Sequence, residues 1–240
     1  MGDRLTAKRK GELLELSAHL GVEFKDLTLL HEALIHSSYA NEAKEKNIVH
    51  NERLEFLGDA VLELASSTYL YMHFPQMPEG QLTKTRASIV CSTSLAELAR
   101  TLHLGDYLFL GHGEEMSGGR DRQTNLEDVF EAVIGAIYLD QGWETAKEYV
   151  VRQLMPLFNQ VEQGAILKDY KTILQEVVYQ EAQQTVSYEL VSTTGPDHDK
   201  TFTFNVKITG KIMGTGIGKS KKEAEQKAAK EALDKIAPTR

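Results

Sequence analysis

Hydrophobic residues recur at helical spacing through the first two thirds of the chain. Leu13, Leu16 and Leu20 illustrate the pattern, with intervals of three and four residues. Because such intervals place side chains on one face of a helix, the pattern predicts amphipathic helices over residues 8–158. We find no alternation of apolar and polar residues in this range. The range is therefore predicted to form an all-α domain.

Turn-forming residues divide this helical pattern into segments. Proline and glycine are frequent at 74–80 and 111–119, and both stretches are predicted to be loops. Polar residues that favour helix N-termini precede two apolar runs: Ser92 before one, and Thr124 with Asn125 before the other. We expect these residues to cap the two helices.

The periodicity changes after the helical region. The helical pattern loosens through residues 159–164, so residues 159–167 are predicted to be a linker, and a further helix is expected from residue 170 to about residue 181. Apolar residues then alternate with polar ones, which predicts strands. The alternating positions are Val186, Tyr188 and Leu190, followed by Phe202, Phe204, Val206 and Ile208. With a short strand at 211–217 and a helix at 220–236, residues 168–238 read as an α-β-β-β-α domain of the α+β class.

Composition agrees with two globular domains. The chain has 240 residues, of which 41% are apolar and 26% charged. No apolar run approaches the ~18 residues that a membrane-spanning helix needs, and the first ten residues lack the apolar core of a secretory signal. The single cysteine, Cys91, cannot form an internal disulfide. We therefore expect a soluble protein of a reducing compartment, the cytoplasm.

The net charge of −8 conceals an uneven distribution. Residues 1–167 contain 15 basic and 25 acidic side chains, whereas residues 168–240 contain 12 basic and 10 acidic ones. The range Lys207–Lys235 alone has eight lysines and four acids. An acidic body is thus joined to a basic tail, and a basic tail can contact phosphates.

Two predicted helices each carry a stripe of carboxylates. Glu52, Glu55 and Asp59 are spaced three and then four residues apart, and Asp128 and Glu131 are three apart, so each set shares one helical face. Most other positions on both helices are apolar, which favours burial. Two solvated acidic faces would explain the stripes equally well. A shared cation site is the alternative that the apolar surroundings favour.

The donor atoms indicate which cation such a site would take. Only oxygen ligands are present, which favours Mg²⁺, with Mn²⁺ as a substitute, over zinc. A di-iron bundle would need Glu-x-x-His pairs, and these helices have none. Carboxylates that hold Mg²⁺ suit hydrolysis at phosphate.

A glycine-rich segment in the tail, Gly214–Ser220, follows a predicted strand and opens a helix, so a nucleotide-binding P-loop is one interpretation to test. The P-loop pattern requires glycine at the position of Met213, and only 20 residues follow Ser220, too few for the parallel sheet that such a loop serves. We therefore expect no nucleotide cofactor.

At the two carboxylate stripes the chain resembles bacterial ribonuclease III, the double-strand-specific endoribonuclease. The sequence of residues 51–59, Asn-Glu-Arg-Leu-Glu-Phe-Leu-Gly-Asp, is that family's signature motif. Further segments match in order and spacing, at 33–41, 79–87, 113–119 and 128–132. Ser37 and Glu127 depart from the usual family residues, a basic residue and an alanine, without removing an implied ligand. His36, in a matched segment, is expected to support the signature helix by packing or hydrogen bonding.

The resemblance implies an activity and a set of site residues. It implies a homodimer that hydrolyses double-stranded RNA, leaving 5′-phosphate and 3′-hydroxyl ends with two-nucleotide 3′ overhangs, in the processing of ribosomal and other structured RNA precursors. The implied metal ligands are Glu55, Asp59, Asp128 and Glu131, with Asp59 and Glu131 catalytic. The implied supporting acids are Glu52, Glu79 and Glu114.

The tail resembles the double-stranded-RNA-binding domain of these enzymes. In such a domain Lys219, Lys221 and Lys222, at the start of the last helix, would bridge phosphates across the major groove. Residues of the first helix and the first strand–strand loop would enter the flanking minor grooves. The implied minor-groove residues are Thr172, Gln175, Glu176, Tyr179, Pro196 and His198. A solvated lysine face is the alternative without the resemblance.

A different class of function uses the same domains. A non-catalytic dimeric regulator that binds double-stranded RNA would need the tail and a dimerising helical domain, but no acid cluster. The two carboxylate stripes argue against this alternative, because negative charge facing a polyanion does not help a protein that only binds.

Overall fold

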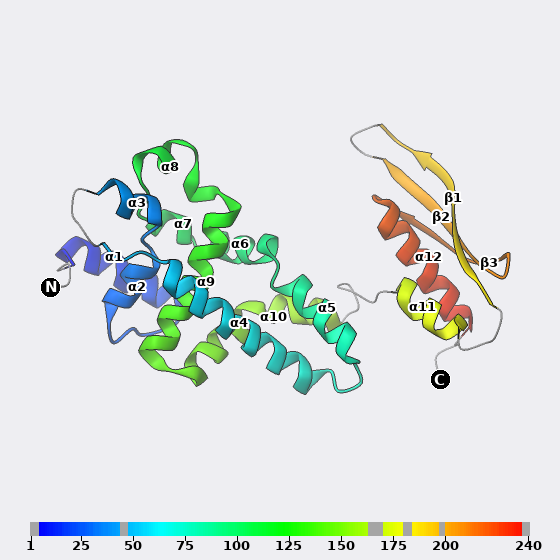
Figure 1. The fold of residues 1–240 in the computed structure, drawn as a ribbon, viewed down its shortest axis with the longest axis horizontal. Coiled ribbons are helices and arrows are strands. Elements are labelled where there is room, and N and C mark those ends of the chain that lie inside the picture. The colour runs from blue at the N-terminus through cyan, green and yellow to red at the C-terminus, as the bar shows by residue number, and fades with distance from the viewer. Residues whose placement is uncertain (1–4, 44–47, 163–169, 180–183, 197–199, 237–240) are drawn as a thin grey trace. The chain divides into compact units, whose positions relative to one another are not determined.

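The computed structural model describes residues 5–43, 48–162, 170–179, 184–196 and 200–236. The chain divides into two compact units, residues 1–167 and 168–240 (Figure 1). Within the described residues, no helix is both long and apolar enough to cross a membrane. The two units correspond to the helical and the mixed parts of the predicted fold.

The first unit is built from helices, as the sequence predicts. They are α1 (Ala7–Leu20), α2 (Leu27–Ala33), α3 (Ser37–Glu42), α4 (Glu52–His73), α5 (Glu79–Ile89), α6 (Ser92–Thr101), α7 (Leu104–Tyr107), α8 (His112–Met116), α9 (Gln123–Gln141) and α10 (Trp143–Glu162), with a 3₁₀ turn η1 (Gly119–Asp121) before α9. Helix α9 occupies the centre, in contact with α2, α4, α6, α7 and α10. These five helices therefore surround α9 (Figure 1).

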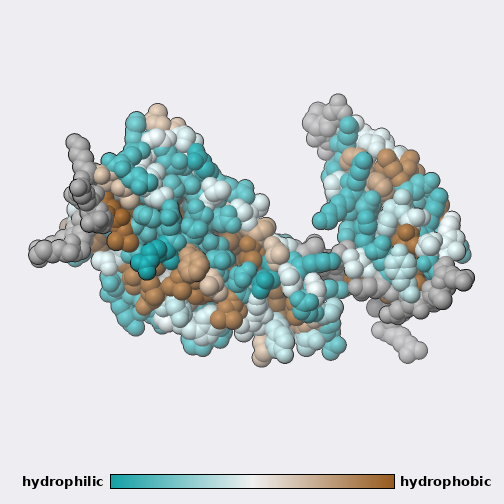
Figure 2. Space-filling view, viewed as in Figure 1, coloured by the Kyte–Doolittle hydropathy of each residue, from teal (hydrophilic) through white to brown (hydrophobic). Residues whose placement is uncertain are grey.

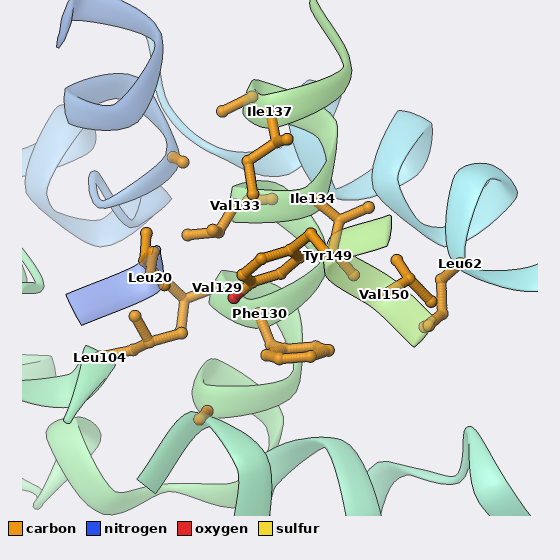
Figure 3. Close-up of a cluster of buried hydrophobic side chains, with 14 of the residues drawn as sticks. Leu20, Leu62, Leu104, Val129, Phe130, Val133, Ile134, Ile137, Tyr149 and Val150 are labelled. Atoms are coloured by element: carbon orange, nitrogen blue, oxygen red, sulfur yellow. The ribbon is translucent and has the colours of Figure 1, made fainter. Parts of the chain in front are cut away.

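The burial of α9 follows from its composition. From Ala132 to Ile137 every residue is buried, and the sequence of this stretch contains no polar side chain. Val133 and Ile134 pack in a cluster with the aromatic rings of Phe130 and Tyr149 (Figure 3). A helix that is apolar on all sides is stable only where other helices cover it, so α9 is fixed in the core.

Helices α4 and α9 approach each other so closely that their backbones touch. A Cβ atom on Gly58 of α4 would overlap the carbonyl oxygen of Glu131, and one on Gly135 of α9 would overlap the carbonyl oxygen of Leu54. Glycine at both positions is therefore required for this crossing.

Helix α4 differs from its prediction. Its apolar composition suggested burial on most sides, yet it buries one face and exposes another. On the exposed face the exposed fractions are 81% for Phe56, 56% for Leu64 and 71% for Tyr71, and Met72, in the last turn of the helix, is 67% exposed. Figure 2 shows hydrophobic residues at the surface where α4 crosses the first unit. This face has no partner within the described residues of the first unit.

The second unit is a three-stranded antiparallel sheet with two helices, as predicted. Its elements are α11 (Tyr170–Tyr179), β1 (Val186–Thr194), β2 (Thr201–Ile208), β3 (Lys211–Gly218) and α12 (Lys221–Ile236), and the strand order is β1-β2-β3. Leu174 and Val178 of α11 pack with Val206 and Ile208 of β2 and with the alanines of α12. Both helices thus cover the same face of the sheet.

The glycines of β3 allow α12 to lie directly on the strand. A Cβ on Gly214 or Gly216 would overlap the carbonyl oxygen of Ala228 or Ala224, respectively. The glycine-rich run is therefore explained by helix–sheet packing, which agrees with the rejection of a P-loop.

Local details differ from the predictions in the loops and caps. The expected loop at 111–119 contains α8, and α9 begins at Gln123, so Thr124 and Asn125 lie inside the helix instead of capping it. The side chain of Asn125 donates to Glu114 Oε1 (2.7 Å) and to the carbonyl oxygen of Gly119 (3.0 Å). Residues 159–162, which we placed in the linker, form the last turn of α10.

The α4–α9 contact predicts a large effect of one methyl group. Gly58→Ala must push the two backbones apart, so its free energy of unfolding should fall by about 1–3 kcal/mol or more. Gly11→Ala is the control, because a Cβ there has no neighbour within 4 Å in helix α1 and alanine is the better helix former. Urea unfolding should show a loss for the first variant and none for the second. Equal stability of both would contradict the close crossing.

Candidate active site

The carboxylates of α4 and α9 lie together beside the glycine crossing. Gly58 lies between Glu55 and Asp59 on α4, and its nearest neighbour on α9 is the backbone of Glu131. Asp128, one turn before Glu131, shares its face of α9. The crossing thus brings the two stripes predicted from sequence into one place.

Burial and repulsion from nearby acids raise the pKa of all four carboxyls. The pKa of Glu131 is raised to about 8 by burial first and then by Asp59, Glu127, Glu55 and Asp128. Burial, followed by repulsion from neighbouring acids, also raises the pKa of Glu55 to about 7 and that of Asp128 to about 6. The pKa of Asp59 is raised as well, by burial and then by Glu63. Each of these groups would therefore gain from a nearby positive charge.

The four carboxyls lie near one another but do not form a complete set of metal ligands. Among the described residues, no three acidic, histidine or cysteine side chains stand close enough together to hold a metal ion. Hard oxygen donors that repel one another in a half-buried place fit a hard divalent cation.

The three supporting acids have different surroundings. Glu52 is exposed in the first turn of α4 and contributes to the raised pKa of Glu55 and of Asp128. Glu79 is exposed at the start of α5 and accepts a hydrogen bond from Thr83 Oγ1 (3.1 Å). Glu114 pairs with Arg122 (2.6 Å), and the hydrogen bond from Asn125 lowers its pKa. Of the three, only Glu52 acts on the pKa values of the four central carboxyls.

Two charged residues of the site were not expected from the sequence. Glu127 is half-buried and contributes to the raised pKa of all four carboxyls. Arg86 of α5 acts in the opposite direction on Asp59 and donates to Ser67 Oγ (3.0 Å). The position of Glu127 next to Asp128 was a usable signal. Arg86 lies in the matched segment 79–87, but its action on Asp59 depends on how α5 packs against α4.

His36 supports the site region through a local cap. It precedes α3, and its Nδ1 accepts a hydrogen bond from the backbone N–H of Ser38 (3.2 Å) and lies 2.8 Å from Ser38 Oγ. Burial lowers the pKa of His36. The hydrogen-bonding role expected for it is present at α3, and not directly on the signature helix α4.

The second unit presents the basic residues at one end of α12. Lys219 follows β3, and Lys221 and Lys222 are exposed in the first turn of the helix. The capping pair Ser220 and Glu223 occupies two backbone N–H groups there. Ser220 Oγ accepts from Glu223 N–H (3.1 Å), and Glu223 Oε2 accepts from Lys219 N–H (2.8 Å).

The expected minor-groove residues lie on α11 and after β1. Thr172, Gln175, Glu176 and Tyr179 belong to α11, where Gln175 and Tyr179 are exposed. Pro196 is exposed just after β1. His198 lies outside the described residues.

Comparison with known proteins gives matches to both units. The family model described as Ribonuclease-III-like matches residues 26–157, and the double-stranded RNA binding motif matches residues 170–236. The curated Ribonuclease 3 of Pelotomaculum thermopropionicum is 52% identical over 224 residues, which are 93% of each chain. That of Desulforamulus reducens is 49% identical over 230 residues, 96% of this chain and 94% of the relative.

A solved structure resembles the first unit. The nuclease domain of ribonuclease III from Campylobacter jejuni is 43% identical to this chain, with a TM-score of 0.56, and the match covers 60% of this chain and 97% of that one. The description of that protein refers to structural flexibility in a region involved in dimer formation.

The raised carboxyl pKa values predict how stability depends on pH without a cation. The unfolded chain loses the Glu131 proton near the ordinary glutamate pKa, whereas the folded chain keeps it until about pH 8. Stability is therefore lost as the pH rises from about 4.5 to 8, because the unfolded state binds fewer protons there. Glu131→Gln should remove the part of this loss that Glu131 causes, so in EDTA its melting temperature should exceed that of the parent by several degrees at pH 8.5 and by little at pH 4.

The matched control removes a negative charge elsewhere. Glu97→Gln on α6, whose side chain is 78% exposed, should show no gain that grows with pH. A Glu131→Gln curve parallel to the parent curve would mean that this carboxyl is not destabilised by its surroundings.

Proposed function

The chain belongs to the ribonuclease III family, and we propose that it hydrolyses double-stranded RNA at the acid cluster shared by α4 and α9. The observation that carries the proposal is the raised pKa of Glu55, Asp59, Asp128 and Glu131 beside the glycine crossing. The family is metal-dependent, and the oxygen donors of this cluster favour Mg²⁺, with Mn²⁺ as a substitute.

In the proposed mechanism these four residues hold the cation. A divalent cation bound there supplies a water of lowered pKa and neutralises charge that develops on the phosphate. Glu131 keeps its proton at neutral pH without a cation and must release it from its carboxyl oxygen to become a ligand. Asp59 and Glu131 are the residues we assign to catalysis. Water adds to phosphorus, the bond to O3′ breaks, and the products carry 5′-phosphate and 3′-hydroxyl ends.

The second unit supplies the affinity for RNA. Its family match is a double-stranded RNA binding motif, and Lys219, Lys221 and Lys222 form a basic end on α12. We assign these lysines to phosphates across the major groove, and α11 and the β1–β2 loop to the flanking minor grooves. Recognition of this kind depends on the shape of the duplex and little on sequence.

The exposed face of α4 supports a homodimer. Phe56, Leu64 and Tyr71 are all more than half exposed on one side of α4, and large apolar side chains that share an exposed face mark an interaction surface. The cluster of acids lies on the same helix, so two copies joined through α4 would bring two sites near one duplex. Sedimentation equilibrium of the full chain tests this, and a monomer at micromolar concentration would contradict it.

The non-catalytic regulator is not favoured. A protein that only binds RNA has no use for buried carboxyls that cost stability at neutral pH. Incubation of the full chain with long duplex RNA, with and without Mg²⁺, tests the activity directly. We expect short duplex products only with the cation, and intact RNA in both reactions would overturn the proposal.

One variant tests the cation site. Glu131→Gln removes a charged ligand with little change of shape, so cleavage should fall at least ~10²-fold because the reacting groups are misplaced. Binding of duplex RNA, measured in Ca²⁺, should be unchanged or slightly tighter. Glu97→Gln should cleave like the parent. If Glu131→Gln cuts at the parental rate in limiting Mg²⁺, Glu131 is not a ligand.

A second pair of variants tests the basic end of α12. Replacement of Lys221 and Lys222 by Ala should weaken binding similarly for all duplex sequences and flatten the slope of log K against log salt by about one to two units. Lys230→Ala with Lys235→Ala, in the other half of the helix, is the matched control. Equal slopes for both double variants would show that Lys221 and Lys222 do not contact phosphate.

A further inference from the structure

The residue that leads into α4 carries a buried amide with no partner. Asn51 is only 2% exposed, and its Nδ2 has no hydrogen-bond partner in the structure. Its backbone is held on both sides, because its N–H donates to the carbonyl oxygen of Ile35 (2.8 Å) and its carbonyl oxygen accepts from Glu55 N–H (2.8 Å). The residue is therefore fixed in place while its side-chain donor is unused.

This unused donor is not explained by capping. An asparagine that caps a helix has an extended backbone and accepts from the first turn, but Asn51 has φ −70° and ψ −19° and makes no capping bond. Buried donors without partners are rare, because they lose their bonds to water and gain nothing. Asn125, which is equally buried at 5% exposed, uses its amide fully, on Glu114 and Gly119.

The helical backbone of Asn51 places its side chain near a carboxyl of the site. Because its dihedral angles are helical and its carbonyl accepts from Glu55, the two residues stand in an i, i+4 relation on one face of α4. An amide and a carboxylate at this spacing can form a hydrogen bond. The structure has no such bond, and the Glu55 carboxyl is half-buried among other acids.

We propose that Asn51 is a positioning residue, whose side-chain amide donates a hydrogen bond to the Glu55 carboxylate when a divalent cation draws the four acids together. This inference rests on the cation site of the proposed function. The bond would fix one oxygen of Glu55 toward the cation and satisfy the buried donor at the same step. Such outer partners of metal ligands typically change metal affinity 10–100-fold.

The role predicts opposite effects with and without the cation. Asn51→Leu keeps the branched shape and the number of side-chain heavy atoms and removes the donor. Without a cation no bond is lost, so its melting temperature in EDTA should equal or exceed that of the parent. With the cation the Glu55 bond is missing, so affinity for Mn²⁺, measured by electron paramagnetic resonance on the RNA-free chain, should be about 10–100-fold weaker.

Ser17→Ala is the control, because Ser17 is buried in α1, away from the acids, and its hydroxyl makes two hydrogen bonds, to the carbonyl oxygen of Val22 and from the N–H of Phe24. It should melt at a lower temperature in EDTA and keep the parental affinity for Mn²⁺. A purely structural role for Asn51 would give Asn51→Leu this same pattern, and that result would overturn the proposal.

A double-mutant cycle locates the effect at Glu55. If Asn51 acts through that carboxylate, Asn51→Leu should cause no further loss of Mn²⁺ affinity in a Glu55→Gln chain. An equal loss in both backgrounds would overturn the assignment of Glu55 as the partner. If the parent binds Mn²⁺ and Asn51→Leu binds it equally well, the Asn51 proposal alone fails. If the parent itself does not bind Mn²⁺, the proposed cation site fails first, and the Asn51 proposal fails with it.

Discussion

Direct backbone contact between α4 and α9 is the constraint on which the site depends. Helices packed through side chains keep their axes about 8–10 Å apart, and carboxyls on such helices point into solvent at the edge of the contact. Glycine at Gly58 and Gly135 removes those side chains, so the two helices meet backbone to backbone. Acids on either side of the crossing are then close enough to change one another's pKa values.

The rest of the first unit holds this unfavourable arrangement in place. Carboxyls that repel one another tend to separate the helices that carry them, whereas the apolar stretch Ala132–Ile137 fixes α9 in the core. The same helix therefore supplies two of the charges and the packing that opposes their repulsion. A cation bound at the proposed site would remove the conflict, and folding and cation binding would then be linked in this unit.

The fold class and the positions of the acids could be predicted from the sequence, because both depend on residues that are close together along the chain. The 3.6-residue and two-residue periods gave the fold class, and the spacing of the acids gave the two stripes that the structure brings together. The roles of these acids as ligands stay predictions. What sequence reasoning missed depends on contacts between distant segments: the use of Asn125 by Glu114 and Gly119, the action of Arg86 on Asp59, and the exposed side of α4.

The contact between β3 and α12 determines how the second unit can respond to its ligand. Gly214, Gly216 and Gly218 meet Ala224 and Ala228 with no long side chain between them. A spacing set by main-chain atoms cannot be adjusted by rotamer changes, unlike one set by leucines or methionines. The backbone at the start of α12, which carries Lys221 and Lys222, therefore lies at a fixed distance from the sheet. A duplex with an irregular groove must deform to fit this unit, because the unit has little freedom to deform in return.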